Sequence, residues 1–180
     1  KVMGLSPYGK PLFIKELRKI IWSGNKNILE WDSSYFKLNK PIHKYETNRP
    51  EVAKLFNDEK FETAFGNKRN LDDLIDQRHK DIASSLQNRV EELIFEVLLR
   101  AYNKTGLKNL CIAGGVAQNS VANGKILQNT PFEKLYIPSA GHDAGISMGA
   151  AQYYYFDSLN NERVEPLYNA NLGISFNNVS

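Results

Sequence analysis

Two glycine-containing segments hold the residue types that could bind a phosphorylated ligand. They are Ala113–Asn119 (AGGVAQN) and Pro138–Gly145 (PSAGHDAG), and each follows a short apolar run. If the two runs are parallel strands, both segments are turns beyond the carboxyl ends of the strands, where α/β sheets bind ligands. Helices that begin at such turns present free backbone N–H groups and favour anions.

The first segment contains two adjacent glycines and one side-chain amide. Gly114 and Gly115 have no Cβ, so a phosphate or a ribose could approach their backbone closely. Asn119 could hydrogen-bond the same ligand. The alternative is a tight strand-to-helix turn that binds nothing, because a lone Gly-Gly pair is neither a dinucleotide fingerprint nor a P-loop.

The second segment places a carboxylate beside an imidazole. Asp143 could cap the following helix, or it could bind a divalent metal ion or a substrate hydroxyl. His142 is interpreted as an exposed loop histidine, with a ligand role as the alternative. Gly145 and the small residues after it leave one helix face nearly flat, which allows close helix packing or a nucleotide lying against the helix.

Other reactive residue types are interpreted as structural. Cys111 lies in a predicted strand and is expected to be buried and unreactive. His43 and His79 are isolated, and the sequence contains no HxxxH or CxxC pattern. The residues Tyr153–Tyr155 indicate ordinary packing or, alternatively, a contact surface.

Hydrophobic periodicity predicts the elements that position these segments. A helical stripe runs from about Asp72 or Gln77 to Asn103 and is stopped by Gly106. Beyond it, strands and helices alternate, which predicts two parallel strands joined by a right-handed crossover. The full set of further expected elements is a loop at Lys1–Lys10, helices at Pro11–Trp22, Glu51–Asn57, Ala117–Asn129 and Asp143–Phe156, and strands at Ile28–Trp31, Ser34–Leu38, Asn109–Ala113 and Lys134–Pro138.

Composition narrows the class of protein. The 180 residues are 42% hydrophobic and 24% charged, as in ordinary globular proteins. The net charge of +3 is too small to indicate nucleic acid binding, and no apolar run approaches the roughly 18 residues of a membrane span. A single cysteine fits a reducing compartment, so we expect a cytoplasmic protein without nucleic acid or membrane partners. The opening residues are typical of the interior of a longer protein.

Four motifs in this order resemble the O-carbamoyltransferase family of nodulation factor, cephamycin and tobramycin biosynthesis. They are Lys1–Lys10 (KVMGLSPYGK), Arg78–Gln87 (RHKDIASSLQ), Asn109–Lys125 (NLCIAGGVAQNSVANGK) and Ser139–Ala151 (SAGHDAGISMGAA). The resemblance implies an α/β fold: part of an actin/sugar-kinase/Hsp70-like (ribonuclease H-like) domain, with a short mixed sheet flanked by helices.

The resemblance also implies a domain order and a reaction. Residues 1–156 would be the second subdomain of the actin-like domain, and residues 157–180 a linker toward a missing C-terminal domain. That missing domain would make carbamoyl-adenylate from carbamoyl phosphate and ATP, and the actin-like domain would transfer the carbamoyl group to a hydroxyl of the acceptor. Because the first subdomain is also missing, the chain alone is expected to be inactive.

Site roles follow from the resemblance residue by residue. The backbone of Gly114 and Gly115 would approach the phosphate or ribose of the adenylate. Asn119 would hydrogen-bond the nucleotide, and Gly145 would keep the nucleotide face open. Asp143 would be one ligand of a divalent metal ion, Fe²⁺ in the intact protein, together with two histidines of the missing subdomain.

The loop Gly4–Gly9 would line the substrate cleft, with Tyr8, Gly9 and His142 as candidate cleft residues. No residue of the chain is identified as the general base, and the acceptor is not identified. Two alternatives stay open: a small-molecule kinase or ATPase of the same superfamily, and a non-catalytic module that binds a nucleotide or a partner.

Overall fold

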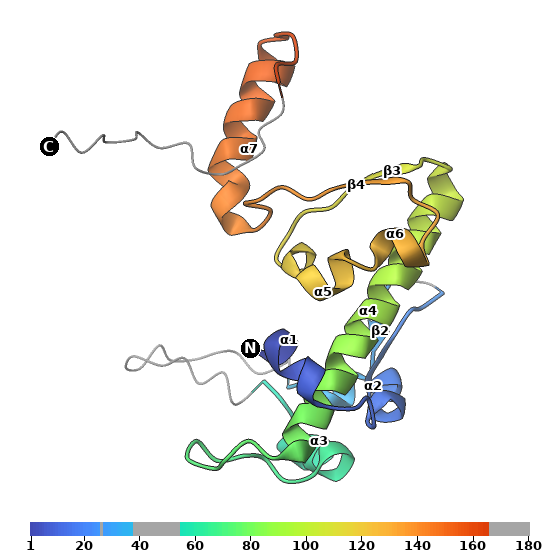
Figure 1. The fold of residues 1–180 in the computed structure, drawn as a ribbon, viewed down its shortest axis with the longest axis vertical. Helices are drawn as coiled ribbons and strands as arrows, with labels where there is room; N and C mark the ends of the chain where they lie inside the picture. Colours follow the sequence, from blue (N-terminus) through green and yellow to red (C-terminus); the bar gives the residue numbers. More distant parts are fainter. Residues whose placement is uncertain (26, 38–54, 166–180) are drawn as a thin grey trace, which may run out of the picture. The chain divides into compact units, whose positions relative to one another are not determined.

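The computed structural model describes residues 1–25, 27–37 and 55–165, which belong to two compact units (Figure 1). The first unit spans Lys1–Ala101, and the second begins at Tyr102. Each unit combines helices with one two-stranded sheet, antiparallel in the first unit and parallel in the second. The chain is therefore a mixed α/β protein, as predicted.

The first unit is mainly helical. Its elements are α1 (Val2–Leu5), a 3-10 turn (Ser6–Tyr8), α2 (Ile14–Ile20), β1 (Ile21–Trp22), β2 (Glu30–Trp31), a 3-10 turn (Ser33–Tyr35), α3 (Asp58–Phe65) and most of α4 (Gln77–Thr105). Helix α4 begins at one of the two predicted positions. It ends at Gly106, whose φ of +65° is a left-handed conformation that favours glycine.

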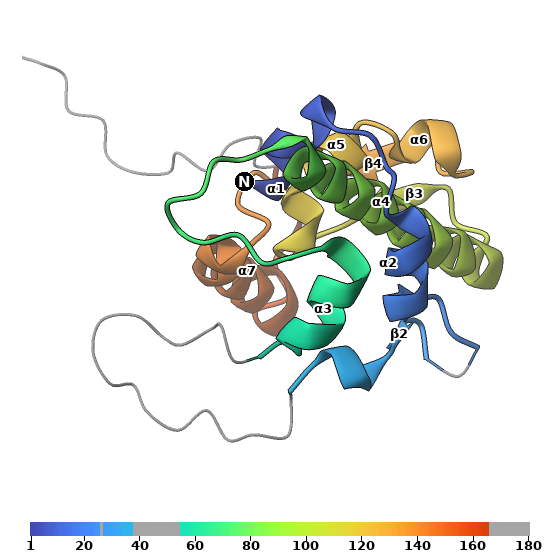
Figure 2. The same cartoon turned by 90° about the horizontal axis from the view of Figure 1, so that it is seen from below.

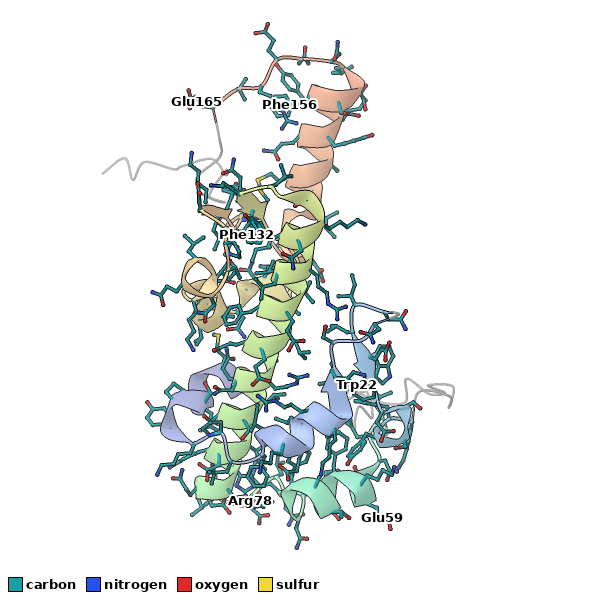
Figure 3. The ribbon with its side chains drawn as sticks, turned by 90° about the vertical axis from the view of Figure 1, so that its right-hand side faces the viewer. Trp22, Glu59, Arg78, Phe132, Phe156 and Glu165 are labelled. Carbon is teal, nitrogen blue, oxygen red and sulfur yellow. The ribbon has the colours of Figure 1, made fainter. Side chains whose placement is uncertain are left out.

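The apolar core of the first unit lies where α2, α3 and α4 meet. Leu17, Ile20 and Phe65 are buried there. Figure 2 shows α2 and α3 beside the first half of α4, which contributes Ile82 and Leu86 to the same core. At the start of α4, the Arg78 guanidinium donates a hydrogen bond of 2.8 Å to the Phe65 carbonyl at the end of α3, and Figure 3 shows its position.

Several short elements of the first unit differ from the sequence predictions. The predicted helix Pro11–Trp22 is shorter, because its last two residues pair with β2 instead of continuing the helix. The predicted strand at Ser34–Leu38 is wrong in its first part, since the Asp32 carboxylate accepts the Ser34 N–H at 2.9 Å and holds a 3-10 turn. Helix α3 was not predicted. The segment Lys1–Lys10 was predicted to be a loop, but it contains α1 and a 3-10 turn.

Four of the predictions fall partly or wholly outside the described residues. For the predicted helix Glu51–Asn57, only residues 55–57 are described, and they precede α3 without being helical. His43 lies outside the described residues, as do Leu38 and residues 166–180 of the predicted linker.

The second unit contains the predicted pair of parallel strands. Its elements are β3 (Asn109–Cys111), a 3-10 turn (Val116–Gln118), α5 (Ser120–Asn123), α6 (Ile126–Asn129), β4 (Lys134–Tyr136), a 3-10 turn (Asp143–Gly145), α7 (Ile146–Tyr153) and a π-helical end (Tyr154–Ser158). Strands β3 and β4 pair in parallel, with Leu110 opposite Leu135. Phe132, labelled in Figure 3, is buried and packs edge-on against Tyr102 at 5.7 Å between ring centroids.

Two predictions for the second unit are wrong in part. The predicted helix Ala117–Asn129 is broken into three short turns, because the Asn119 side chain starts a new helix by capping α5. Cys111 was expected to be buried, but it is exposed. In both strands only the central leucine is partly covered, and Cys111 points to the same open side as the other strand ends.

Helix α7 carries none of its residues in a buried position. The three consecutive tyrosines at its end are all exposed, which fits the contact-surface alternative rather than packing within the described residues. No helix in the described part of the chain is long and apolar enough to cross a membrane. The cytoplasmic location stays a prediction.

Candidate functional site

The two glycine-containing turns of the second unit lie together. Because β3 and β4 are parallel, the turns that follow them are at the same end of the sheet. They are joined directly, since the Gly114 N–H donates a hydrogen bond to the Gly141 carbonyl. The structure therefore brings the first predicted segment against the second.

Gly114 and Gly115 face open space. Apart from its chain neighbours, a Cβ built on either residue would meet no atom of the described residues within 4 Å. Gly114 has a φ of +104°, a conformation that residues other than glycine rarely adopt. Gly115 has an ordinary helical φ of −59°, so neither its conformation nor packing among the described residues requires glycine there. The predicted approach of a ligand to Gly115 stays a prediction.

Asn119 has a structural role in this turn. Its side-chain oxygen accepts the Ala122 N–H at 3.1 Å and caps the first turn of α5. Such a cap satisfies one of the backbone donors that a helix start leaves without a partner. The predicted hydrogen bond from Asn119 to a nucleotide stays a prediction.

Gly145 is in a different environment from Gly115. A Cβ on Gly145 would lie 1.9 Å from the carbonyl oxygen of Ala140, so the backbones pack too closely for any side chain. This contact supports close packing, which is one of the two alternatives for Gly145. An open nucleotide face at Gly145 stays a prediction.

Asp143 does not have the capping role that the sequence suggested. The capping residue is His142, whose Nδ1 accepts the Ala144 N–H at 3.3 Å. Both Asp143 and His142 are exposed, and the Asp143 carboxylate lies in the first turn of the 3-10 helix. The predicted metal-binding role of Asp143 is compatible with this exposure.

The described residues do not form a metal centre by themselves. Nowhere in residues 1–25, 27–37 and 55–165 do three His, Cys, Asp or Glu side chains gather within reach of one ion. The Nδ1 of His142 accepts a backbone N–H, so this nitrogen is not available to an ion. A centre that includes Asp143 needs ligands from outside this set.

The remaining candidates, Tyr8 and Gly9, belong to the first unit. Tyr8 is 69% exposed, while its backbone carbonyl accepts a hydrogen bond of 3.2 Å from the Gln77 side chain. A Cβ on Gly9 would lie 2.0 Å from the Lys80 carbonyl oxygen, so the loop backbone rests directly on α4. The predicted cleft that these residues would share with the second unit stays a prediction.

The residues that hold this loop were not identified from the sequence. Asp81 is buried, and its carboxylate accepts the Lys10 N–H at 2.8 Å and the Gln77 side-chain N–H at 2.9 Å. These hydrogen bonds hold the pKa of Asp81 below its ordinary value, and the bond from the Lys10 N–H has the largest effect. Ser85, one turn further, is fully buried and accepts the Phe13 N–H at 2.9 Å.

One more turn along α4, Arg89 donates two hydrogen bonds of 3.1 and 2.8 Å to the Ile21 carbonyl. Gln77, Asp81, Ser85 and Arg89 are four residues apart, so they share one face of the helix. In the sequence this row is a polar residue at every fourth position, directly before the apolar residues Ile82, Leu86 and Val90. We call these four residues the polar row of α4.

Comparison with known proteins identifies the family of this chain. A family model described as the carbamoyltransferase N-terminus matches residues 1–152. The chain belongs to this carbamoyltransferase family. A nodulation protein NolO from Bradyrhizobium diazoefficiens is 33% identical over 84% of the chain, and an uncharacterised protein from Synechocystis is 36% identical over 91% of it.

The chain spans about a quarter of the length of these two relatives. It spans 24% of the length of the Bradyrhizobium protein and 25% of the Synechocystis protein. A tRNA N6-adenosine threonylcarbamoyltransferase from Dictyoglomus turgidum is 38% identical over 42% of the chain, so the likeness extends to a protein named for transferring a related group. The resemblance deduced from the four motifs is confirmed.

Proposed function

We propose that the full-length protein is an ATP-dependent O-carbamoyltransferase, and that this chain is part of its actin/sugar-kinase-like transfer domain. The substrates would be carbamoyl phosphate, ATP and a hydroxyl-bearing small molecule or glycan. The family match over residues 1–152 supports the reaction class. The observation that carries the role of this chain is the open backbone at Gly114 and Gly115, beside a second turn at the same sheet edge.

In this proposal the two turns bind the adenylate. Residues without side chains allow the phosphate to approach the backbone, and the adjacent helical turns favour its negative charge. The acceptor hydroxyl oxygen attacks the carbamoyl carbon, the bond from that carbon to the phosphate oxygen breaks, and AMP leaves with the electron pair. The hydroxyl proton passes to a base that the described residues do not identify.

A divalent metal ion, proposed to be Fe²⁺, would polarise the carbamoyl carbonyl or orient the acceptor hydroxyl. Asp143 is the residue of this chain that fits such an ion, because its carboxylate is exposed at the edge where the two turns meet. The other ligands would come from the part of the protein that precedes this chain.

The proposal separates two chemical steps that can be measured independently. Formation of carbamoyl-adenylate releases pyrophosphate, and we assign that step to a domain outside this chain. Carbamoyl transfer, followed with labelled carbamoyl phosphate, requires the two turns. The test compares wild-type full-length protein with Gly115→Val and Asp143→Ala.

We expect pyrophosphate release to survive both substitutions and carbamoyl transfer to fall by at least tenfold. Gly124→Val is the matched control, because a Cβ there would make only an ordinary contact of 3.6 Å. If Gly115→Val and Asp143→Ala both transfer the carbamoyl group as well as wild type, the turns have no role in the reaction. Phosphorylation of the acceptor instead of carbamoylation would identify a kinase.

A further inference from the structure

The apolar core of the first unit borders a cavity of about 560 Å³. The core residues Leu17, Ile20 and Phe65 line it, although protein interiors are normally close-packed, with few voids larger than a water molecule. Small-molecule sites are cavities of about 300–1,000 Å³ with a mainly apolar lining and a few polar groups. Every described residue that lines this cavity lies within residues 17–86, so the cavity belongs to the first unit alone.

Four phenylalanines form an aromatic wall of this cavity. Phe61 lies at its centre, because it packs edge-on against Phe56 at 5.5 Å and against Phe36 at 6.2 Å between ring centroids. It also stacks on Phe65 at 5.9 Å. Aromatic rings prefer such edge-to-face and offset contacts, at about 4.5–7 Å between centroids, and a flat ligand ring can extend the cluster in the same way. The wall therefore favours an aromatic ligand over a flexible aliphatic one.

The polar part of the lining has an excess of positive charge. It contains three basic side chains, Lys68, Arg69 and Arg78, and two carboxylates, Asp58 and Glu62. Lys68 forms an ion pair with Asp58 at 3.6 Å, while the Glu62 carboxylate accepts the Lys68 backbone N–H at 3.1 Å. With the one histidine of the lining counted as neutral, one positive charge is left over. A ligand with a single negative charge would balance it.

Arg78 presents a fixed guanidinium in this lining (Figure 3). It donates hydrogen bonds of 2.8 and 3.0 Å to the carbonyls of Phe65 and Asn67, and one of its nitrogens lies 3.4 Å from Nε2 of His79. These contacts use at most three of the five N–H donors of a guanidinium. The Asp76 carboxylate interacts electrostatically with Arg78, but it accepts the His79 N–H at 3.0 Å. Arg78 thus keeps donors for an anion, and a carboxylate matches their planar geometry.

We propose that this cavity binds a small aromatic carboxylate, with the ligand ring among the phenylalanines and the ligand carboxylate on the Arg78 guanidinium. The ring extends the aromatic cluster, and the carboxylate balances the excess positive charge. The first unit supplies every residue of this site. The proposal is therefore independent of the two turns of the second unit and of the proposed function.

The first experiment compares three probes by titration calorimetry on the full-length protein. They are 2-naphthoate, the uncharged 2-naphthalenemethanol and the aliphatic carboxylate decanoate. We expect one 2-naphthoate per chain, bound about tenfold more tightly than either of the other probes, because it alone combines a ring with a charge. Absence of 2-naphthoate binding would overturn the proposal. Equal or tighter binding of decanoate would overturn the aromatic assignment.

The second experiment assigns the charge to Arg78. Arg78→Gln should weaken 2-naphthoate about tenfold and leave 2-naphthalenemethanol unchanged, because only the carboxylate uses the guanidinium. Arg78→Lys, which keeps the charge without the planar donors, should weaken 2-naphthoate by a smaller factor. A merely structural role of Arg78 would weaken the charged and the uncharged probe alike, and that result would overturn the proposal.

Arg100→Gln is the matched control for this substitution. Arg100 is also an arginine of α4 that donates to a backbone carbonyl, that of Gly24 at 2.6 Å, but it is not among the described residues that line the cavity. Its replacement changes the net charge by the same amount and is expected to leave the affinity for both probes unchanged. Equal weakening of 2-naphthoate in Arg78→Gln and Arg100→Gln would contradict a contact at Arg78.

The third experiment tests the aromatic wall. Phe56 is 41% exposed, so Phe56→Leu removes a ring from the wall without opening the buried core. We expect it to weaken 2-naphthoate about fivefold and to leave decanoate unchanged. The control is Tyr35→Leu, since Tyr35 packs edge-on against the same Phe61 ring at 5.2 Å but is not among the described lining residues. Wild-type affinity in Phe56→Leu, or an equal loss in Tyr35→Leu, would overturn the placement of the ligand ring.

Discussion

The loop on α4 and the turn after β3 both contain glycine, yet the structure uses glycine differently in them. At Gly9 a side chain has no room, because the carbonyl oxygen of Lys80 would lie 2.0 Å from its Cβ. At Gly115 the same atom would meet nothing within 4 Å. The first loop is fixed by buried polar groups, whereas the second turn is exposed and stays open on one side. Glycine therefore indicates a backbone contact at position 9 and available space at position 115.

The largest loss of stability is expected at Gly9, where the structure leaves no room for a side chain. Gly9→Ala should destabilise the first unit by about 3 kcal/mol, because the backbone of the loop or of α4 must move to admit the Cβ. Urea unfolding of the chain can measure this by fluorescence, since both tryptophans, Trp22 and Trp31, lie in the first unit. A loss below about 0.5 kcal/mol would show that the loop does not rest on α4.

A smaller effect is expected where a hydrogen bond is lost without a clash. Ser85→Ala should lower the free energy of unfolding by roughly 2 kcal/mol, because the Phe13 N–H loses its acceptor in a buried place. Asn88→Ala is a suitable control, since the Asn88 side chain donates only to a carbonyl of its own helix. Equal losses in the two variants would mean that the contact between loop and helix contributes nothing.

The Asp81 carboxylate of the polar row predicts that the free energy of unfolding depends on pH. The pKa of Asp81 is lowered in the folded chain, so its contribution to stability is present above its unfolded pKa of about 3.9. That contribution is lost as pH falls below this value and through the folded pKa. The difference in unfolding free energy between wild type and Asp81→Asn should therefore shrink on acidification from pH 5. A constant difference across that range would contradict the assigned hydrogen bonds.

The smallest effect on stability is expected at the open glycine. Gly115→Ala should change the free energy of unfolding of this chain by less than about 0.5 kcal/mol, because the new Cβ meets no atom and the backbone is already helical. Circular dichroism during urea unfolding can follow the second unit. A large loss of stability would mean that position 115 is closed, and its proposed access for a ligand would be wrong.

The comparison also shows what the sequence could predict. The start of α4 and the parallel pairing of β3 with β4 follow from hydrophobic periodicity, which is a local signal. The anchor of the loop depends on partners 71 and 72 residues apart in the sequence, such as Asp81 with Lys10 and Ser85 with Phe13. No local pattern encodes such a pair, although the polar residues at every fourth position of α4 mark one side of it.

The wrong predictions have the same origin. Cys111 was expected to be buried because its strand is apolar in sequence, but the described sheet has only two strands and leaves that side open. Asp143 was one candidate for the helix cap, yet its neighbour His142 accepts the Ala144 N–H. The choice between adjacent side chains depends on backbone angles that composition does not determine. The candidate residues were located by motif, whereas their contacts required the structure.

The hydrogen bond from Gly114 to Gly141 has an evolutionary consequence. The two turns, 27 residues apart in the chain, meet through one backbone contact, and Gly141 is itself enclosed by the Gln118 side chain and the Pro138 carbonyl. An insertion or deletion in either turn would move one partner away from the other unless the opposite turn changed as well. Among relatives of this chain, the lengths of these two turns are therefore expected to be inherited together, even where the residues within them differ.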